Sequence, residues 1–292
     1  MTAFDLPPGG SIAVDWSGAL SGAQRKICLA EARGGRLLRV EGGRDREQVV
    51  AHLAEAARRD PQLAVGLDFA FGFPAWFARA RGLETVEETW ALAAREGEAW
   101  LRDCPFPFWG RPGVPRPDYG ADRSPFRRTE SEAPPLEGIH PKSVFQVGGA
   151  GTVGTGSLRG MPHLPALRAA GFALLPFDPP RGPLAFEIWP RLLSGPVNKS
   201  DGVTRWTWLQ FRFPDQDPDL VRRAAETEDS FDAAVSALML DRFLRGSSTF
   251  PTARDEVDRI EGRIWRPQLD PLVREARFSA GWQASGGAAR TR

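Results

Sequence analysis

The sequence SIAVDW at residues 11–16 and the sequence LAVGLDFAF at residues 63–71 decide the fold of this protein. Each is a short, continuous apolar run, which is typical of a strand buried on both faces of a sheet. Working outward from the first run, residues 26–31 and 36–41 have the composition of two further strands joined by a tight glycine turn. Residues 45–60 place apolar side chains at helical spacing, so we expect a helix shortly before the second run.

This order of three strands, a helix and a fourth strand predicts the topology of a sheet. The first three strands form an antiparallel meander, and the helix returns the chain so that the fourth strand lies parallel beside the first, which becomes central. Further helices are expected at 85–103, 226–244 and 254–264, and further strands at 172–177 and 185–188. We therefore expect an α/β fold with a mixed sheet flanked by helices.

Composition limits the classes of function and the domain organisation. The net charge of +1 argues against strong non-specific nucleic-acid binding, and two cysteines exclude a disulfide framework or a cysteine-rich zinc site. Because neither a signal peptide nor an apolar run of about 20 residues is present, we expect a cytoplasmic location and no membrane partner. We expect a single domain at 1–265, with an insertion rich in Pro, Arg and aromatic residues at 105–138. A C-terminal extension at 266–292 is expected to end in a disordered tail.

Two aspartates interrupt the apolar strands at equivalent places. Asp15 ends the first strand and Asp68 follows LAVGL in the fourth. Because the carboxyl ends of parallel neighbours meet at one edge of a sheet, both carboxylates are expected there, where α/β sheets bind ligands. Singly, each aspartate could equally be a turn former.

Further carboxylates follow on the later elements. Asp229 and Asp232 are three residues apart and share a face of the predicted helix, whose alanines at 233, 234 and 237 allow close approach to the sheet. Asp229 could instead be only a favourable charge at the helix N-terminus. Glu187 is a weaker candidate ligand at the end of a later strand, because an ion pair with Arg191 would also explain it.

Converging carboxylates repel one another unless a cation lies between them, and Mg²⁺ or Mn²⁺ prefers such oxygen ligands. Two ions could activate water and stabilise a leaving phosphate oxygen. We expect Asp15 to bridge the ions, Asp68 and Asp232 to complete their ligation, and Asp229 to tune or join the site. The predicted reaction is metal-dependent hydrolysis of a phosphodiester.

Several segments also resemble a known family. VDWSGA, VGLDFAFGFP, PKSVFQVGGAGTVGTGSLRGM, FEIWPR and DSFDAAVSA are similar to the family of domain of unknown function 429, described as predicted RNase H-like nucleases. The resemblance extends from about residue 12 to 265. It implies an RNase H-like core in which Asp15, Asp68 and the Asp229/Asp232 pair match acidic positions of related nucleases such as Holliday-junction resolvases.

A glycine-rich loop, VGGAGTVGTGS, supplies possible phosphate contacts. Its Gly149 and Gly151 could present backbone N–H groups to a phosphate, although a merely flexible loop is an equal alternative. The same loop contains a GxGxxG match, but glycines and prolines at 156, 160, 162 and 165 are expected to interrupt the helix that a dinucleotide-binding fold requires. Lys142 lies just before the loop and could contact the phosphate or simply be exposed.

The insertion and the first turn supply the remaining substrate candidates. Arg127 and Arg128 belong to a stretch of interleaved basic and aromatic residues that could hold a single strand, or could form a solvated surface. Ser17 lies in VDWSGALSG, which loosely resembles the phosphate-binding hairpin of actin-like ATPases. Nucleotide binding or phosphotransfer is therefore an alternative function, and a non-catalytic nucleic-acid-binding module is another. The expected partner is DNA or RNA, including single-stranded and branched forms, or a small phosphate ester. The sequence does not indicate an oligomeric state.

Overall fold

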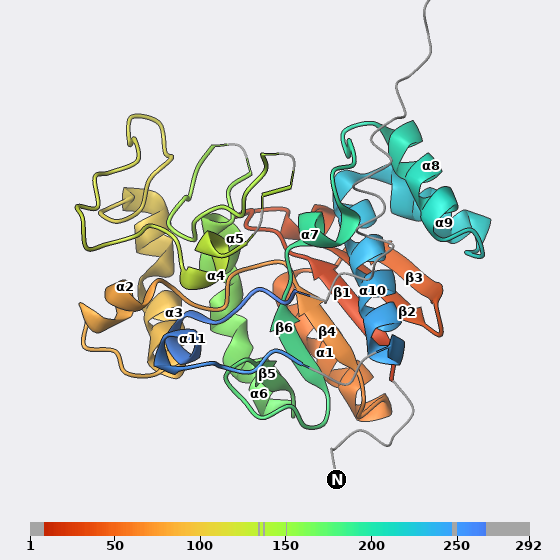
Figure 1. The fold of residues 1–292 in the computed structure, drawn as a ribbon, viewed down its shortest axis with the longest axis horizontal. Coiled ribbons are helices and arrows are strands. Elements are labelled where there is room, and N and C mark those ends of the chain that lie inside the picture. Colours follow the sequence, from red (N-terminus) through yellow and green to blue (C-terminus); the bar gives the residue numbers. More distant parts are fainter. Residues whose placement is uncertain (1–8, 134, 137, 150, 247–249, 267–292) are drawn as a thin grey trace, which may run out of the picture.

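The computed structural model describes residues 9–133, 135–136, 138–149, 151–246 and 250–266. A six-stranded mixed sheet with strand order β3-β2-β1-β4-β6-β5 forms its centre, and helices flank the sheet (Figure 1). The strands are β1 (Ser11–Asp15), β2 (Cys28–Arg33), β3 (Arg36–Gly42), β4 (Ala64–Leu67), β5 (Ala173–Leu175) and β6 (Leu184–Glu187).

The predicted arrangement of the first four strands is confirmed. Strands β1, β2 and β3 form an antiparallel meander, and β4 lies parallel beside β1, which is central. Several boundaries differ from those predicted, and two of the differences have a local cause. Strand β2 begins two residues later because Ala23–Arg25 form a 3-10 turn ahead of it, and β4 ends at Leu67 because the chain leaves the sheet after Asp68.

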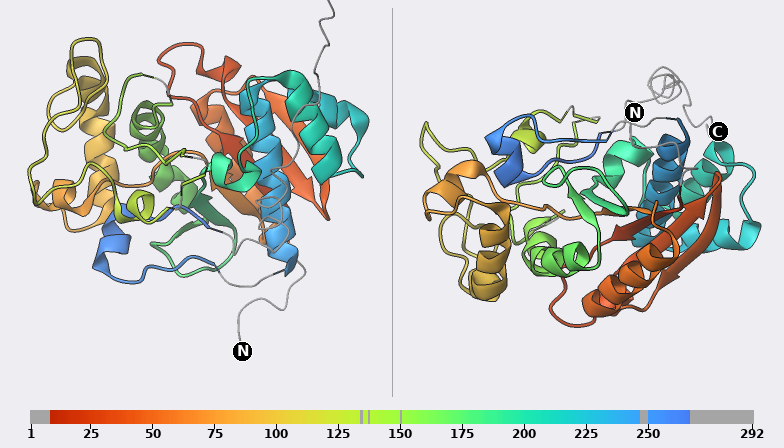
Figure 2. Two further views of the ribbon diagram at one scale, coloured as in Figure 1. Left: turned by 45° about the horizontal axis from the view of Figure 1, so that its top comes forward. Right: turned by 90° about the horizontal axis from the view of Figure 1, so that it is seen from below.

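The helices cover both faces of the sheet, as Figure 2 shows. On one face lie α1 and the helices that pack with it, and on the other lies α10 with its neighbours. The first group comprises α1 (Arg46–Arg59), α3 (Val86–Asp103), α5 (Gly154–Gly160) and α6 (Leu164–Ala169), and the second comprises α7 (Pro190–Ser194), α8 (Gly202–Arg212), α9 (Pro218–Glu226) and α10 (Glu228–Gly246). Three short helices, α2 (Ala75–Arg79), α4 (Arg128–Ser131) and α11 (Glu256–Glu261), lie away from the strands.

Helix α10 lies close against the strands, as its small side chains predict. Ala233, Ala234 and Ala237 are all buried, and Ser11 Oγ of β1 donates a hydrogen bond to the carbonyl oxygen of Ala237 at 2.8 Å. A Cβ atom at Gly66 of β4 would lie within 3.0 Å of the side chains of Ile188, the residue after β6, and of Leu240 in α10. Close packing therefore fixes the height of α10 above the sheet edge that carries the aspartates.

The expectation of an interrupted helix after the glycine-rich loop is confirmed in part: a helix passes through Gly156, but it ends at Gly160, and a 3-10 turn that contains Pro162 separates it from the next helix. Helix α5 begins at Gly154, inside the GxGxxG match, and a 3-10 turn and α6 follow it directly. The two prolines are accommodated because each lies in the first turn of its own helical segment, where no amide donor is needed. However, residues 143–147 before the loop form no strand of the sheet; Gln146 makes only an isolated bridge to Trp109. The loop thus lacks the strand that a dinucleotide-binding motif requires.

The remaining expectations concern the insertion and the C-terminus. In the described part of 105–138, Phe108, Trp109 and Tyr119 are buried, and Tyr119 Oη donates to the carbonyl oxygen of Pro107 at 2.6 Å. The expected extension lies, from residue 267 onward, outside the described residues. Among the helices that are described, none has the length and apolar character needed to cross a membrane.

Candidate active site

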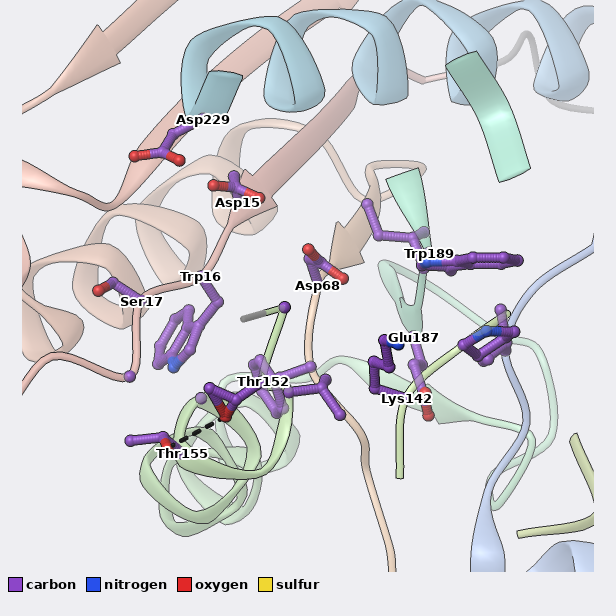
Figure 3. Close-up of a pocket in the computed structure, with 18 of the residues that line it drawn as sticks. Asp15, Trp16, Ser17, Asp68, Lys142, Thr152, Thr155, Glu187, Trp189 and Asp229 are labelled. Carbon is purple, nitrogen blue, oxygen red and sulfur yellow. Dashed lines mark hydrogen bonds between the residues drawn. The ribbon is translucent and has the colours of Figure 1, made fainter. Parts of the chain in front are cut away.

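A pocket of about 540 Å³ lies at the edge of the sheet where β1 and β4 end. Asp15, Asp68 and Asp229 form part of its wall, and the view in Figure 3 shows them close together, each coming from a different element. Thr152 and Thr155, from the glycine-rich loop and α5, lie across the pocket from the carboxylates (Figure 3).

The backbone of β1 and β4 brings Asp15 and Asp68 together. Val14 pairs with Leu67 in the parallel register, and the amide of Asp68 donates to the carbonyl oxygen of Val14 at 3.1 Å. The two aspartates therefore follow paired positions, as the sequence predicts. Both are only partly exposed, because apolar strands flank them on either side.

Helix α10 supplies the other two aspartates from its first turns. Its start is fixed by Thr227 and Ser230, since each backbone amide donates at 3.0 Å to the other's hydroxyl oxygen. Asp229 consequently lies in the first turn and reaches the pocket. Asp232, one turn further along, is not among the pocket-lining residues. Its carboxylate instead accepts both a 2.6 Å hydrogen bond and a second, shorter one from Lys199 Nζ.

Burial raises the pKa of all four carboxyl groups, and repulsion from neighbouring aspartates adds to the effect at Asp15 and Asp68. Burial raises the pKa of Asp68 to about 7, with Asp232 adding to the effect. The pKa of Asp15 is raised well above its ordinary value, first by burial and then by Asp68, Asp232 and Asp229. Burial also raises the pKa of Asp229 and of Asp232. The site therefore holds more negative charge than its surroundings stabilise.

A divalent cation would fit the chemistry of this donor set, because carboxylate oxygens are its preferred ligands and its charge would relieve the repulsion. As the side chains stand in the described residues, no three or more His, Cys, Asp or Glu form a group that could hold a metal ion. Ion binding thus requires these aspartates to reorient. Asp15, Asp68 and Asp229 are the residues that would do so, since they line the pocket.

Glu187 lies at the end of β6, next to β4, but its carboxylate is already bonded. It accepts hydrogen bonds from Arg127 Nη1 at 2.8 Å and from Arg127 Nη2 at 2.5 Å. The partner is therefore Arg127, not the Arg191 that the sequence suggested. Arg127 is 1% exposed and also bonds Glu130, so its charge is balanced within the fold. Both Glu187 and Arg127 line the pocket, but because they are bonded to each other we leave them out of the proposed metal and phosphate contacts.

The other predicted substrate contacts divide into two groups. Ser17, Lys142 and Gly151 line the pocket, and the Lys142 side chain lies against Gly151. Gly149 is not a lining residue. Arg128 does not line it either, and its guanidinium donates to Asp255 at 2.7 Å. The turn that carries Ser17 packs against the start of α5, because a Cβ atom at position 18 would lie only 2.5 Å from the amide nitrogen of residue 156.

Sequence reasoning predicted Lys142 but missed Lys26 and Lys199, the other two lysines of this region. The chain has only three lysines among its 38 basic residues, and all three lie at or beside the carboxylates. Lys26 and Lys142 line the pocket, Lys26 lowers the pKa of Asp229, and Lys199 binds Asp232. The rarity of lysine in the sequence was the signal that could have identified these residues as functional candidates. The excess of arginine, which codon bias can explain, concealed it.

Comparisons with known proteins found no match, so the geometry of the pocket is the basis for assigning a function. No family model, no curated protein and no solved structure matches the chain.

Proposed function

We propose that this protein is a metal-dependent phosphodiester hydrolase with an RNase H-like core. The observation that carries the proposal is the convergence of Asp15, Asp68 and Asp229, from three separate elements, on the wall of one pocket. The meander followed by a parallel strand beside β1 supports the RNase H-like assignment. It also supports membership of the family of domain of unknown function 429, which remains part of the proposal.

The residues of the pocket supply complementary parts of this chemistry. Asp15, Asp68 and Asp229 would hold Mg²⁺ or Mn²⁺, which when bound lowers the pKa of a water nucleophile and stabilises charge on a phosphate. Lys26 and Lys142 place positive charge on the same pocket, where they can bind the phosphate oxygens. Ser17 and the backbone around Gly151 add hydrogen-bonding groups to its wall.

Pocket dimensions and composition indicate the size of the substrate group. A volume of about 540 Å³ lies within the range typical of small-ligand sites, about 300–1,000 Å³. It can admit one nucleotide unit of DNA or RNA, or a small phosphate ester. Trp189 lies on the same pocket and is partly exposed, so its ring is available to an aromatic base.

Cleavage assays with Mn²⁺ test the proposal. The substrates are single-stranded, duplex and branched DNA and RNA, together with bis(p-nitrophenyl) phosphate as a small ester. We expect metal-dependent cleavage by the wild type and its loss in Asp15→Asn. Asp103→Asn is the matched control, because Asp103 is exposed, pairs with its neighbour Arg102 and does not line the pocket.

Two results would contradict the proposal in different ways. Cleavage retained by Asp15→Asn would remove Asp15 from the mechanism. No cleavage of any substrate by a wild type that binds Mn²⁺ would refute the hydrolase and direct attention to nucleotide binding or phosphotransfer.

A further inference from the structure

Asp232 differs from the other three aspartates in having a buried cation as its partner. Lys199 is 8% exposed, and its ammonium contacts both oxygens of the Asp232 carboxylate. Neither residue lines the pocket, whereas Asp15, Asp68 and Asp229 do. The structure thus withholds one carboxylate of the cluster from the pocket and neutralises it internally.

A second buried cation fixes the segment that carries Lys199. The guanidinium of Arg205, in α8, donates to the carbonyl oxygen of Lys199. It also donates to the carbonyl oxygens of Ala225 and Glu226, both at 2.9 Å. These two carbonyls end α9, directly before the helix that bears Asp232. Arg205 therefore ties the backbone of Lys199 to the start of α10.

The same segment is held at a second point. Arg191 Nη1 of α7 donates to the carbonyl oxygen of Val197 at 2.6 Å. With the backbone bonded at positions 197 and 199, the lysine side chain is directed onto Asp232 by the fold. This contrasts with an exposed lysine, which loses rotamer freedom to form an ion pair of little value.

The ion pair places the charge of Lys199 beside the other aspartates. Asp232, whose two oxygens the ammonium contacts, lies one helical turn beyond Asp229 on α10. Lys199 thus already supplies the cluster with part of the positive charge that a metal ion would bring. A cation that used the oxygens of Asp232 would have to displace this ammonium and then remain beside it in a poorly solvated site.

We propose that Lys199 takes the place of a second metal ion, so that the site binds one divalent cation, at Asp15 and Asp68 with Asp229 beside them. The inference rests on the proposed function and revises the two-ion expectation drawn from the sequence. Asp232 then acts as a positioning residue that holds the lysine charge against the metal ligands. A lysine suits this place because its compact ammonium fits where one carboxylate is the partner.

The stoichiometry of Mn²⁺ binding tests this without relying on catalysis. Free Mn²⁺ is measured by electron paramagnetic resonance while the wild type, Lys199→Met and Lys26→Met are titrated. We expect one Mn²⁺ per chain in the wild type and two in Lys199→Met, because Asp232 is released as a ligand. Lys26→Met should remain at one, since Lys26 lines the pocket and does not bond Asp232.

The outcomes separate this inference from the proposed function. Two Mn²⁺ per wild-type chain would overturn the inference while leaving a metal-dependent hydrolase intact, and a wild type that binds none would overturn both. One Mn²⁺ without cleavage would support the inference and refute the hydrolase. Lys199→Met could fail to fold because Asp232 loses its partner. The double variant Lys199→Met/Asp232→Asn removes both charges and should bind one Mn²⁺ per chain. The number of Mn²⁺ ions bound by the wild type decides the inference in either case.

Discussion

Replacing Asp68 by asparagine should stabilise the metal-free protein. Burial raises the pKa of this carboxyl group to about 7, against about 3.9 in an unfolded chain. Between these two pH values the folded protein binds more protons than the unfolded one, so the free energy of unfolding falls as the pH rises through this range. Asparagine carries no charge and removes that loss.

The size of the effect follows from the same two values. A difference of about three pKa units corresponds to about 4 kcal/mol at a pH above 7. Because Asp68 is partly exposed and titrates together with the neighbouring Asp15, we expect about half, or about 2 kcal/mol. The difference between the variant and the wild type should therefore be largest at pH 8 and should disappear near pH 4.

Urea denaturation followed by tryptophan fluorescence measures this difference. In EDTA at pH 8, Asp68→Asn should unfold at a higher urea concentration than the wild type. In excess Mn²⁺ the order should reverse, because an ion that binds only the folded wild type stabilises it by mass action. Asp122→Asn, at an exposed position, is the control and should match the wild type. A variant no more stable than the wild type in EDTA at pH 8 would refute the reasoning.

Three further changes test the surroundings of the site. Arg127→Met should lower the free energy of unfolding by about 3–5 kcal/mol in urea denaturation, since it leaves two buried glutamates without their cation. Burial raises the pKa of Cys28 to about 12, so a Cys104→Ser protein should react slowly with dithionitrobenzoate at pH 8 until urea unfolds it. Gly160→Ala should cost about 1–3 kcal/mol in thermal denaturation, because its Cβ would lie 2.7 Å from the Phe69 ring.

The two stability changes each have a matched control variant, and the thiol reaction is compared with that of the unfolded chain. Arg128→Met removes a more exposed guanidinium that pairs with Asp255, so a loss as large as that of Arg127→Met would contradict the argument from burial. For the thiol, a native reaction as fast as that of the unfolded chain would contradict the raised pKa. Gly97→Ala places a Cβ atom 3.5 Å from its nearest neighbour inside α3, so it should be neutral or stabilising where Gly160→Ala is costly.

The order and polarity of the strands could be predicted because local patterns specify them. Continuous apolar runs predicted β1 and β4, and the helix between them required the two to be parallel. With that topology known, Asp15 and Asp68 had to meet at one edge. The helical spacing of Asp229 and Asp232 likewise gave their shared element. These inferences needed only the chain direction and the periodicity of the residues.

Only the tertiary structure decided which charges pair. Lys199 reaches Asp232 across 33 residues, and Arg127 reaches Glu187 across 60. No periodicity links such positions, since each pair depends on where the irregular segment that carries the cation lies after the helices have packed on the sheet. The glycine-rich loop shows the same dependence, because its helix forms where local propensity argued against one. The sequence by itself thus determined where the carboxylates gather, whereas packing determined which of them are free to face the pocket.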